Sequence, residues 1–91
     1  MKKKIVILGS TGSIGRSTLE IIKNTNEFKV ELIIANKNYT KILDQIKVFK
    51  PRIVIVHNEK IYLKIKKKYK NKNIIFLNNI FNVSKYVSTI D

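Results

Sequence analysis

All three glycines of this 91-residue chain lie close together, at Gly9, Gly12 and Gly15. They follow a short apolar run, Ile5–Leu8, and precede a segment whose apolar residues are spaced as in a helix. Glycine is needed where the backbone bends sharply or approaches another group closely, so this order predicts a strand, a tight turn and a helix. The stretch from Lys4 to Ile22 therefore limits the chain to folds in which a buried strand turns directly into a helix.

The glycine-bearing turn has the features of a phosphate-binding loop. A helix that begins directly after such a turn directs free backbone N–H groups and the positive end of its dipole at the space above the sheet. Gly9 would allow the turn, Gly12 would let a pyrophosphate approach the backbone, and Gly15 would let the helix pack on the strand. Three hydroxyls could donate to phosphate oxygens: Ser10, Thr11 and Ser13. The spacing G-x-x-G-x-x-G is one residue longer than the common pattern, so an ordinary strand-to-helix loop stays open as an alternative.

A second polar loop follows the next expected strand, which spans about Lys29–Ile34. In a nucleotide-binding unit this position lies beside the adenosine ribose, and an acidic residue there accepts a hydrogen bond from the 2′-hydroxyl of NAD. The chain instead has Asn36, Lys37 and Asn38. A lysine and two amides would bind a 2′-phosphate that a carboxylate would repel. The loop therefore favours NADP over NAD, although Lys37 could also reflect the lysine-rich composition.

The rest of the chain continues the alternation of apolar runs and amphipathic segments. We expect helices at Ser13–Lys23, Tyr39–Phe49 and Glu59–Lys70, strands at Lys4–Leu8, Ile53–Val56 and Ile74–Leu77, and a last amphipathic segment from Asn78 with Ile80, Val83 and Val87 on one side. This rhythm predicts an α/β fold, a Rossmann-like doubly wound parallel sheet truncated after about four βα units. We expect helices on both faces and the strand order 3-2-1-4.

The composition is strongly basic, with a net charge of +13. Such a charge attracts nucleic acid or phosphorylated ligands, and Lys64–Lys72 is the densest run. Lysine, isoleucine and asparagine all have codons rich in A and T, so genome composition would produce this charge without a polyanionic partner. We therefore favour the solvent face of a helix for Lys64–Lys72 over a nucleic-acid-binding patch. The chain lacks cysteine and any apolar run long enough to cross a membrane, and it is expected to be one cytoplasmic domain.

No residue is assigned a catalytic role. His57 follows the third expected strand without a carboxylate or nucleophile beside it in sequence, so we interpret it as incidental. Tyr62 and Tyr69 stand at helical spacing and are interpreted as the edge of the core rather than as a platform for bases. The six acidic residues form no pair that suggests a magnesium site.

The string Gly9-Ser10-Thr11-Gly12-Ser13-Ile14-Gly15, with Ser17-Thr18-Leu19 after it, resembles the N-terminus of 1-deoxy-D-xylulose 5-phosphate reductoisomerases. Ala35–Asn38 and Phe49–Arg52 add to the resemblance, which extends over the whole chain. The family enzyme uses NADPH and Mg²⁺ or Mn²⁺. It rearranges and reduces 1-deoxy-D-xylulose 5-phosphate to 2-C-methyl-D-erythritol 4-phosphate in non-mevalonate isoprenoid biosynthesis.

The resemblance implies a set of cofactor contacts. Thr11, Gly12, Ser13 and Ile14 would contact the pyrophosphate side of NADPH, and Asn36, Lys37 and Asn38 would hold the adenosine ribose and its 2′-phosphate. Many relatives have glycine where this chain has Asn36. Residues 1–91 would then be an incomplete NADPH-binding domain, with the metal site outside this segment. The full-length protein would act on a small phosphosugar as a homodimer, without nucleic acid or membrane partners. Two alternatives are the cofactor domain of another NADP-dependent dehydrogenase, such as a semialdehyde dehydrogenase, and a small basic module that binds nucleic acid.

Overall fold

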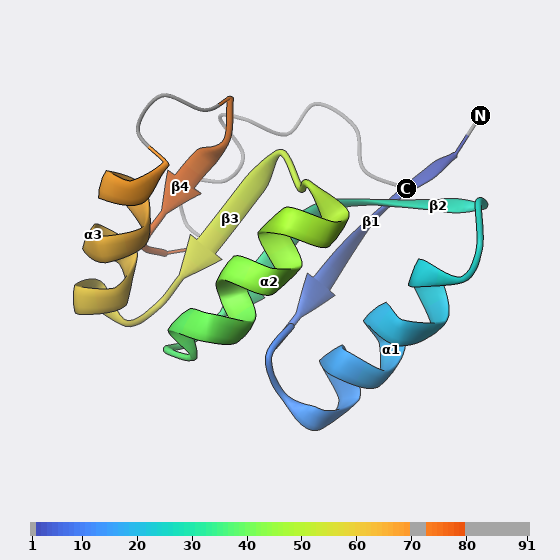
Figure 1. The fold of residues 1–91 in the computed structure, drawn as a ribbon, viewed down its shortest axis with the longest axis horizontal. Helices are drawn as coiled ribbons and strands as arrows, with labels where there is room; N and C mark the ends of the chain where they lie inside the picture. Colours follow the sequence, from blue (N-terminus) through green and yellow to red (C-terminus); the bar gives the residue numbers. More distant parts are fainter. Residues whose placement is uncertain (1, 70–72, 80–91) are drawn as a thin grey trace.

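The structure is a computed structural model that describes residues 2–69 and 73–79. It consists of a four-stranded parallel sheet and three helices that alternate with the strands along the chain (Figure 1). In chain order the elements are β1 (Lys3–Leu8), α1 (Ser13–Lys23), β2 (Phe28–Ala35), α2 (Tyr39–Phe49), β3 (Ile53–Val56), α3 (Glu59–Lys68) and β4 (Ile75–Leu77). None of these helices is long and apolar enough to cross a membrane.

The predicted α/β class and the parallel sheet are confirmed, and the bounds of α1, α2 and β3 agree with those read from the sequence. Pro51 ends α2 as expected, because Lys50 leaves the helical conformation and adopts a φ of 48° at the C-cap. The last expected amphipathic segment, with Ile80, Val83 and Val87, lies outside the described residues.

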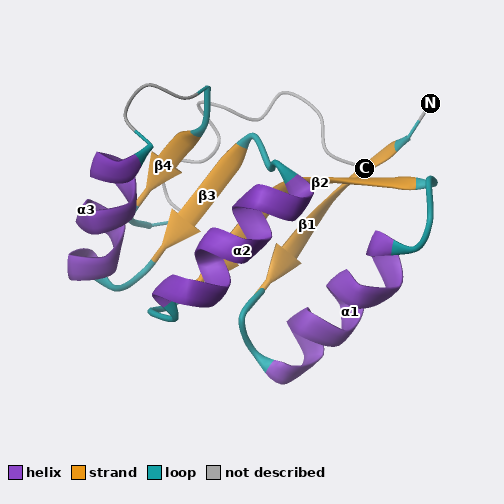
Figure 2. Ribbon diagram, in the orientation of Figure 1, coloured by secondary structure: helices purple, strands orange, loops and turns teal. Residues whose placement is uncertain are grey.

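The predicted strand order 3-2-1-4 is right for the first three strands and wrong for the fourth. The strands follow one another across the sheet as β1-β2-β3-β4, so β4 pairs with β3 and not with β1. A short crossover through the ten-residue α3 reaches the adjacent position, and strands that are consecutive in sequence are usually neighbours. Right-handed crossovers that always step in one direction place every helix on the same face. The expectation of helices on both faces is therefore also wrong for the part of the chain described: α1, α2 and α3 share one face (Figure 2).

The sheet buries apolar residues on both faces, as its continuous apolar strands predict. One cluster joins the helices to the sheet and includes Leu19 of α1, Ile42 of α2 and Ile65 of α3. The opposite face forms a separate cluster, centred on Leu32, Ile34, Ile53 and Ile55.

A bulge in β2 sets the register of its two halves. Ile5 pairs with Val30, whereas Val6 pairs with Leu32, so Glu31 is the extra residue. The Glu31 side chain is only 2% exposed, and its Oε2 accepts a hydrogen bond from Arg52 Nε at 2.6 Å. The Arg52 N–H also donates to the Glu31 carbonyl. The bulge thus places a buried carboxylate beside a cation at the start of β3.

Candidate functional site

Two loops predicted from the sequence to bind a cofactor lie at the same edge of the sheet. Leu8 of β1 pairs with Ile34 of β2, so the glycine loop (residues 9–15) and the 36–38 loop leave the sheet side by side. The Asn36 carbonyl accepts a hydrogen bond from the Asn58 N–H, which ties the 36–38 loop to the segment after β3. This carboxyl-end edge is where ligands bind in open parallel sheets.

The glycine loop has the geometry predicted for two of its glycines. Gly9 has a φ of 65°, a conformation that residues with a Cβ seldom adopt, and this confirms its role in the turn. Gly15 is buried, and a Cβ there would lie 2.2 Å from the Gly9 carbonyl oxygen and 2.9 Å from the Ser10 Cα. Only glycine therefore lets the first turn of α1 pack so closely on the loop that leaves β1.

The N-terminus of α1 differs from those of the other two helices. Asn38 caps α2 by accepting from the Lys41 N–H at 3.2 Å, and Asn58 caps α3 by accepting from the Ile61 N–H at 3.1 Å. The N-cap of α1 is Gly12, which has no side chain to accept such a bond. The first backbone N–H groups of α1 therefore have no side-chain cap, so they can donate to an anion.

The side chains of the glycine loop divide into exposed and buried ones. Ser13 is exposed and Thr11 half-buried, so both hydroxyls can reach a ligand, and Ile14 is 84% exposed. Ser10 is fully buried. The expectation that the Ser10 hydroxyl donates to a phosphate is therefore wrong, because the turn directs this side chain into the protein.

The three polar residues of the 36–38 loop are all exposed. Lys37 forms no ion pair with any residue in the described ranges, so its ammonium group is available to an anionic ligand. The Asn38 side chain already caps α2 through its oxygen, which leaves its amide nitrogen as the group that can face a ligand.

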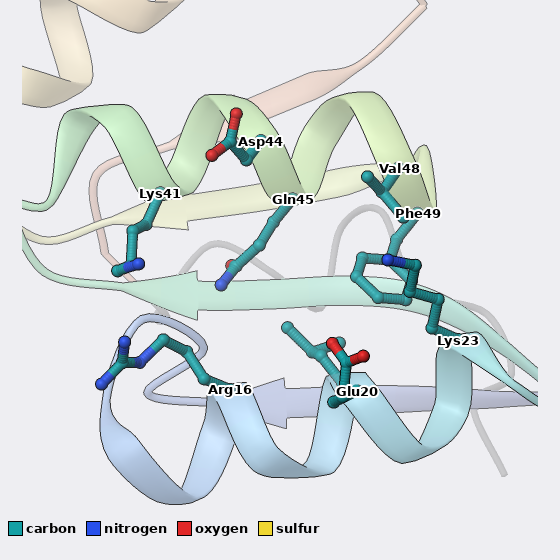
Figure 3. Close-up of a pocket in the computed structure, with 9 residues that line it drawn as sticks. Arg16, Glu20, Lys23, Lys41, Asp44, Gln45, Val48 and Phe49 are labelled. Carbon is teal, nitrogen blue, oxygen red and sulfur yellow. The ribbon is translucent and has the colours of Figure 1, made fainter.

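Sequence reasoning missed Gln45, which belongs to α2 and is 8% exposed. Its Nε2 donates to the Ser10 carbonyl oxygen at 2.7 Å. Figure 3 shows the side chain extending from α2 into a pocket between α1 and α2, with Arg16 and Lys41 at one end. The available signal was its position: Gln45 lies three residues after Ile42 and four before Phe49, on the apolar face of the helix.

Other residues considered in the sequence do not join this site. His57 is exposed, and its backbone N–H donates to the Ala35 carbonyl. Tyr62 and Tyr69 pack against the core, as predicted, and Tyr69 stacks on Phe76. Within residues 2–69 and 73–79, no three His, Cys, Asp or Glu side chains come together as a metal site would require.

The alternative of a nucleic-acid-binding module requires Arg52 to form one continuous basic surface with Lys64–Lys72. Its guanidinium is engaged by the buried carboxylate of Glu31. An arginine that compensates a buried charge is poorly placed to leave it for a phosphate backbone.

Comparison with known proteins gives the same family over most of the chain. The family model for 1-deoxy-D-xylulose 5-phosphate reductoisomerase matches residues 5–88. The reductoisomerase of Pelagibacter ubique is 44% identical over 88 residues, which are 96% of this chain and 23% of that protein. A Buchnera aphidicola reductoisomerase is 49% identical over 73 residues, which are 79% of this chain and 18% of that protein.

Solved structures of reductoisomerases share the fold. The Zymomonas mobilis enzyme in complex with NADPH has a TM-score of 0.75 and 26% identity, covering 85% of this chain and 21% of that one. A reductoisomerase in complex with magnesium has a TM-score of 0.75 and 28% identity, and the match covers 85% of this chain and 20% of that one. The chain spans about a fifth of the length of the curated relatives it matches. Because the family model matches nearly all of its residues, the chain belongs to the 1-deoxy-D-xylulose 5-phosphate reductoisomerase family.

Proposed function

We propose that residues 1–91 form part of the NADPH-binding domain of a 1-deoxy-D-xylulose 5-phosphate reductoisomerase. The glycine loop binds the pyrophosphate side of the cofactor, and the 36–38 loop binds the adenosine ribose with its 2′-phosphate. The residues that make these contacts are Thr11, Gly12, Ser13, Ile14, Asn36, Lys37 and Asn38.

The observation that carries the proposal is the N-terminus of α1. Two of the three described helices have an asparagine cap, whereas α1 begins at Gly12 with no side-chain cap, at the carboxyl edge of the sheet. The free N–H groups and the helix dipole there favour an anion. The absence of a side chain at Gly12 leaves room for a pyrophosphate to reach the backbone.

The 36–38 loop supplies the preference for NADPH over NADH. Lys37 is exposed and adds a positive charge where NAD-dependent proteins commonly have a carboxylate. A 2′-phosphate is stabilised by an ammonium group and by amide N–H donors such as that of Asn38. The same loop has no acidic residue that would repel it.

Within the whole protein, this domain would hold NADPH for the reduction that yields 2-C-methyl-D-erythritol 4-phosphate. NADPH supplies the hydride, and the residues named above bind and orient it. We propose no metal chemistry for the described residues, since no three of their His, Cys, Asp or Glu side chains lie together. The Mg²⁺ or Mn²⁺ site is proposed to belong to the part of the family enzyme that this chain does not match. A phosphosugar substrate, a homodimer and a cytoplasmic location are likewise proposals for the whole protein.

The proposal is tested by calorimetric titration of the chain with NADPH and with NADH, after a dispersed amide NMR spectrum has shown that it is folded. We expect NADPH to bind more tightly. Lys37→Glu should remove that preference by lowering the affinity for NADPH about tenfold or more, which corresponds to about 1.4 kcal/mol of binding free energy. Gly12→Val should weaken both cofactors, because its side chain would occupy the space above the helix N-terminus.

The matched control is Lys67→Glu, which makes the same charge change on the exposed face of α3. It should leave the ratio of the two affinities unchanged. Equal binding of NADPH and NADH by the folded chain, or an equal effect of the two lysine variants, would contradict the role of Lys37. A folded chain that binds neither cofactor would overturn the proposed function.

A further inference from the structure

We infer that Gln45 is a positioning residue for cofactor binding: it holds the glycine loop at a fixed place relative to the 36–38 loop. This inference rests on the proposed function. Gln45 lies in α2, and its Nε2 donates to the carbonyl oxygen of Ser10, a residue 35 positions earlier in the chain, at 2.7 Å. The bond is buried, and Gln45 itself does not belong to either loop.

Both backbone groups of Ser10 are used to anchor the glycine loop. Its N–H donates to the Ile34 carbonyl at 2.9 Å, near the end of β2, and its carbonyl accepts from Gln45. Ile34 and Gln45 flank the 36–38 loop in the sequence, one in the strand before it and one in the helix after it. The two bonds therefore fix the glycine loop to the strand–loop–helix unit that carries Lys37.

A fixed separation between these loops matters for a ligand that spans them. In NADPH the pyrophosphate and the 2′-phosphate lie on opposite sides of one ribose, so binding both requires the two loops to be correctly spaced. A loop that is already held in place loses less conformational freedom when the ligand binds. Side chains behind a binding site contribute to affinity in this way without touching the ligand.

The chemistry of the contact explains why the residue is a glutamine. The Gln45 Oε1 and the Ser10 Oγ are both buried and have no hydrogen-bond partner among the described residues. A carbonyl acceptor and a hydroxyl donor are complementary, and they belong to two residues that are already joined, so one water that accepts from the Ser10 hydroxyl and donates to Gln45 Oε1 would satisfy both atoms. Glutamate would lack the N–H donor, and lysine would bury a charge.

The first test uses Gln45→Met, which keeps the length of the side chain and removes its donor and acceptor. Amide hydrogen exchange is measured by NMR on the chain without cofactor. We expect the amides of Ser10 and Gly12, which donate to Ile34 and Gly9, to exchange about tenfold faster, while Val54 in β3 exchanges as before. Ile46→Val, a conservative change at the next buried position of α2, is the control and should leave Ser10 and Gly12 unchanged. Unaltered exchange at Ser10 and Gly12 in Gln45→Met would overturn the inference.

The second test separates positioning from general destabilisation. Gln45→Met should lower the affinities for NADPH and NADH by the same factor, about tenfold, because only the glycine loop is released. The ratio of the two affinities should therefore stay unchanged. Adenosine 2′-monophosphate, which has no pyrophosphate, should bind the variant and the original chain equally well. Weakening of all three ligands by the same factor would overturn the inference. If the folded original chain binds no NADPH while the exchange result holds, the proposed function fails and the anchoring of the glycine loop stands.

Discussion

The carbonyl oxygen of Gly9 occupies the place where a side chain on Gly15 would begin: a Cβ at Gly15 would lie only 2.2 Å from it. The obstacle is backbone, so it cannot move aside as the end of a flexible side chain could. The contact sets the distance between the first turn of α1 and the loop that leaves β1. It also determines how the free N–H groups of α1 face the carboxyl edge of the sheet.

Gly15→Ala should therefore destabilise the chain by about 2–3 kcal/mol, the upper part of the range for overpacking a tight site. Urea unfolding followed by circular dichroism measures the change. Gly12→Ala is the matched comparison, because a Cβ there would lie 3.3 Å from the same oxygen and its φ of −79° suits any residue. Gly12→Ala should lower the free energy of unfolding by less than about 1 kcal/mol. Equal losses for the two variants would show that close packing at Gly15 is not the cause.

At Lys50, by contrast, replacing the native residue with glycine should stabilise the chain. It has a φ of 48° at the C-cap of α2, a left-handed conformation that glycine adopts without steric cost. Lys50→Gly should raise the free energy of unfolding by about 0.5–1 kcal/mol. The same substitution at Lys47, inside the last turn of α2, should lower it by about the same amount. Thermal unfolding of both variants checks the prediction, which fails if they shift in the same direction.

Arg52→Met should be strongly destabilising because it leaves the Glu31 carboxylate buried without its cation. We expect the free energy of unfolding, measured by urea denaturation, to fall by about 3 kcal/mol. In the double variant Glu31→Leu/Arg52→Met the buried charge is gone as well, and much of that loss should be recovered. A double variant as unstable as Arg52→Met alone would contradict this account of the bulge.

The two asparagine caps should have separable effects. Asn38→Ala and Asn58→Ala each remove one side-chain bond to a helix N-terminus, and each should reduce stability by about 1 kcal/mol. Only Asn38→Ala should also weaken NADPH, since Asn38 is proposed to face the 2′-phosphate. Titration of both variants with NADPH at a temperature where both are folded provides the measurement. A similar weakening by Asn58→Ala would assign the effect to lost stability rather than to a cofactor contact.

The elements could be predicted because their signals are local. Ile53–Val56 is continuously apolar, as a strand buried on both faces must be, and the asparagines before α2 and α3 are strong N-cap residues. Gly9 and Gly15 could be interpreted because a turn directly before a helix restricts the backbone at those positions. Each of these inferences depends on residues within one or two turns of each other.

The position of β4 in the sheet and the anchoring of the glycine loop could not be predicted, because they depend on contacts between distant residues. The apolar run at Ile75–Leu77 pairs equally well with any strand of suitable length, so nothing in it favours β3 over β1. Ser10 and Thr11 are adjacent hydroxyl residues, and only the course of the turn decides which one is buried. The partner of Gln45 is 35 residues away in sequence, and no local pattern marks it.

The strand order also has a consequence for the time course of folding. Every pairing in the sheet joins strands that follow one another along the chain, so each new strand can add to an edge that already exists. Such sequential addition closes shorter loops than a pairing of β4 with β1 would, and it suits a chain that emerges from the ribosome N-terminus first. Both loops and the glutamine that anchors the glycine loop are present once Phe49 has been synthesised. We therefore expect the edge formed by β1 and β2 to assemble during translation, before β3 and β4 have been made.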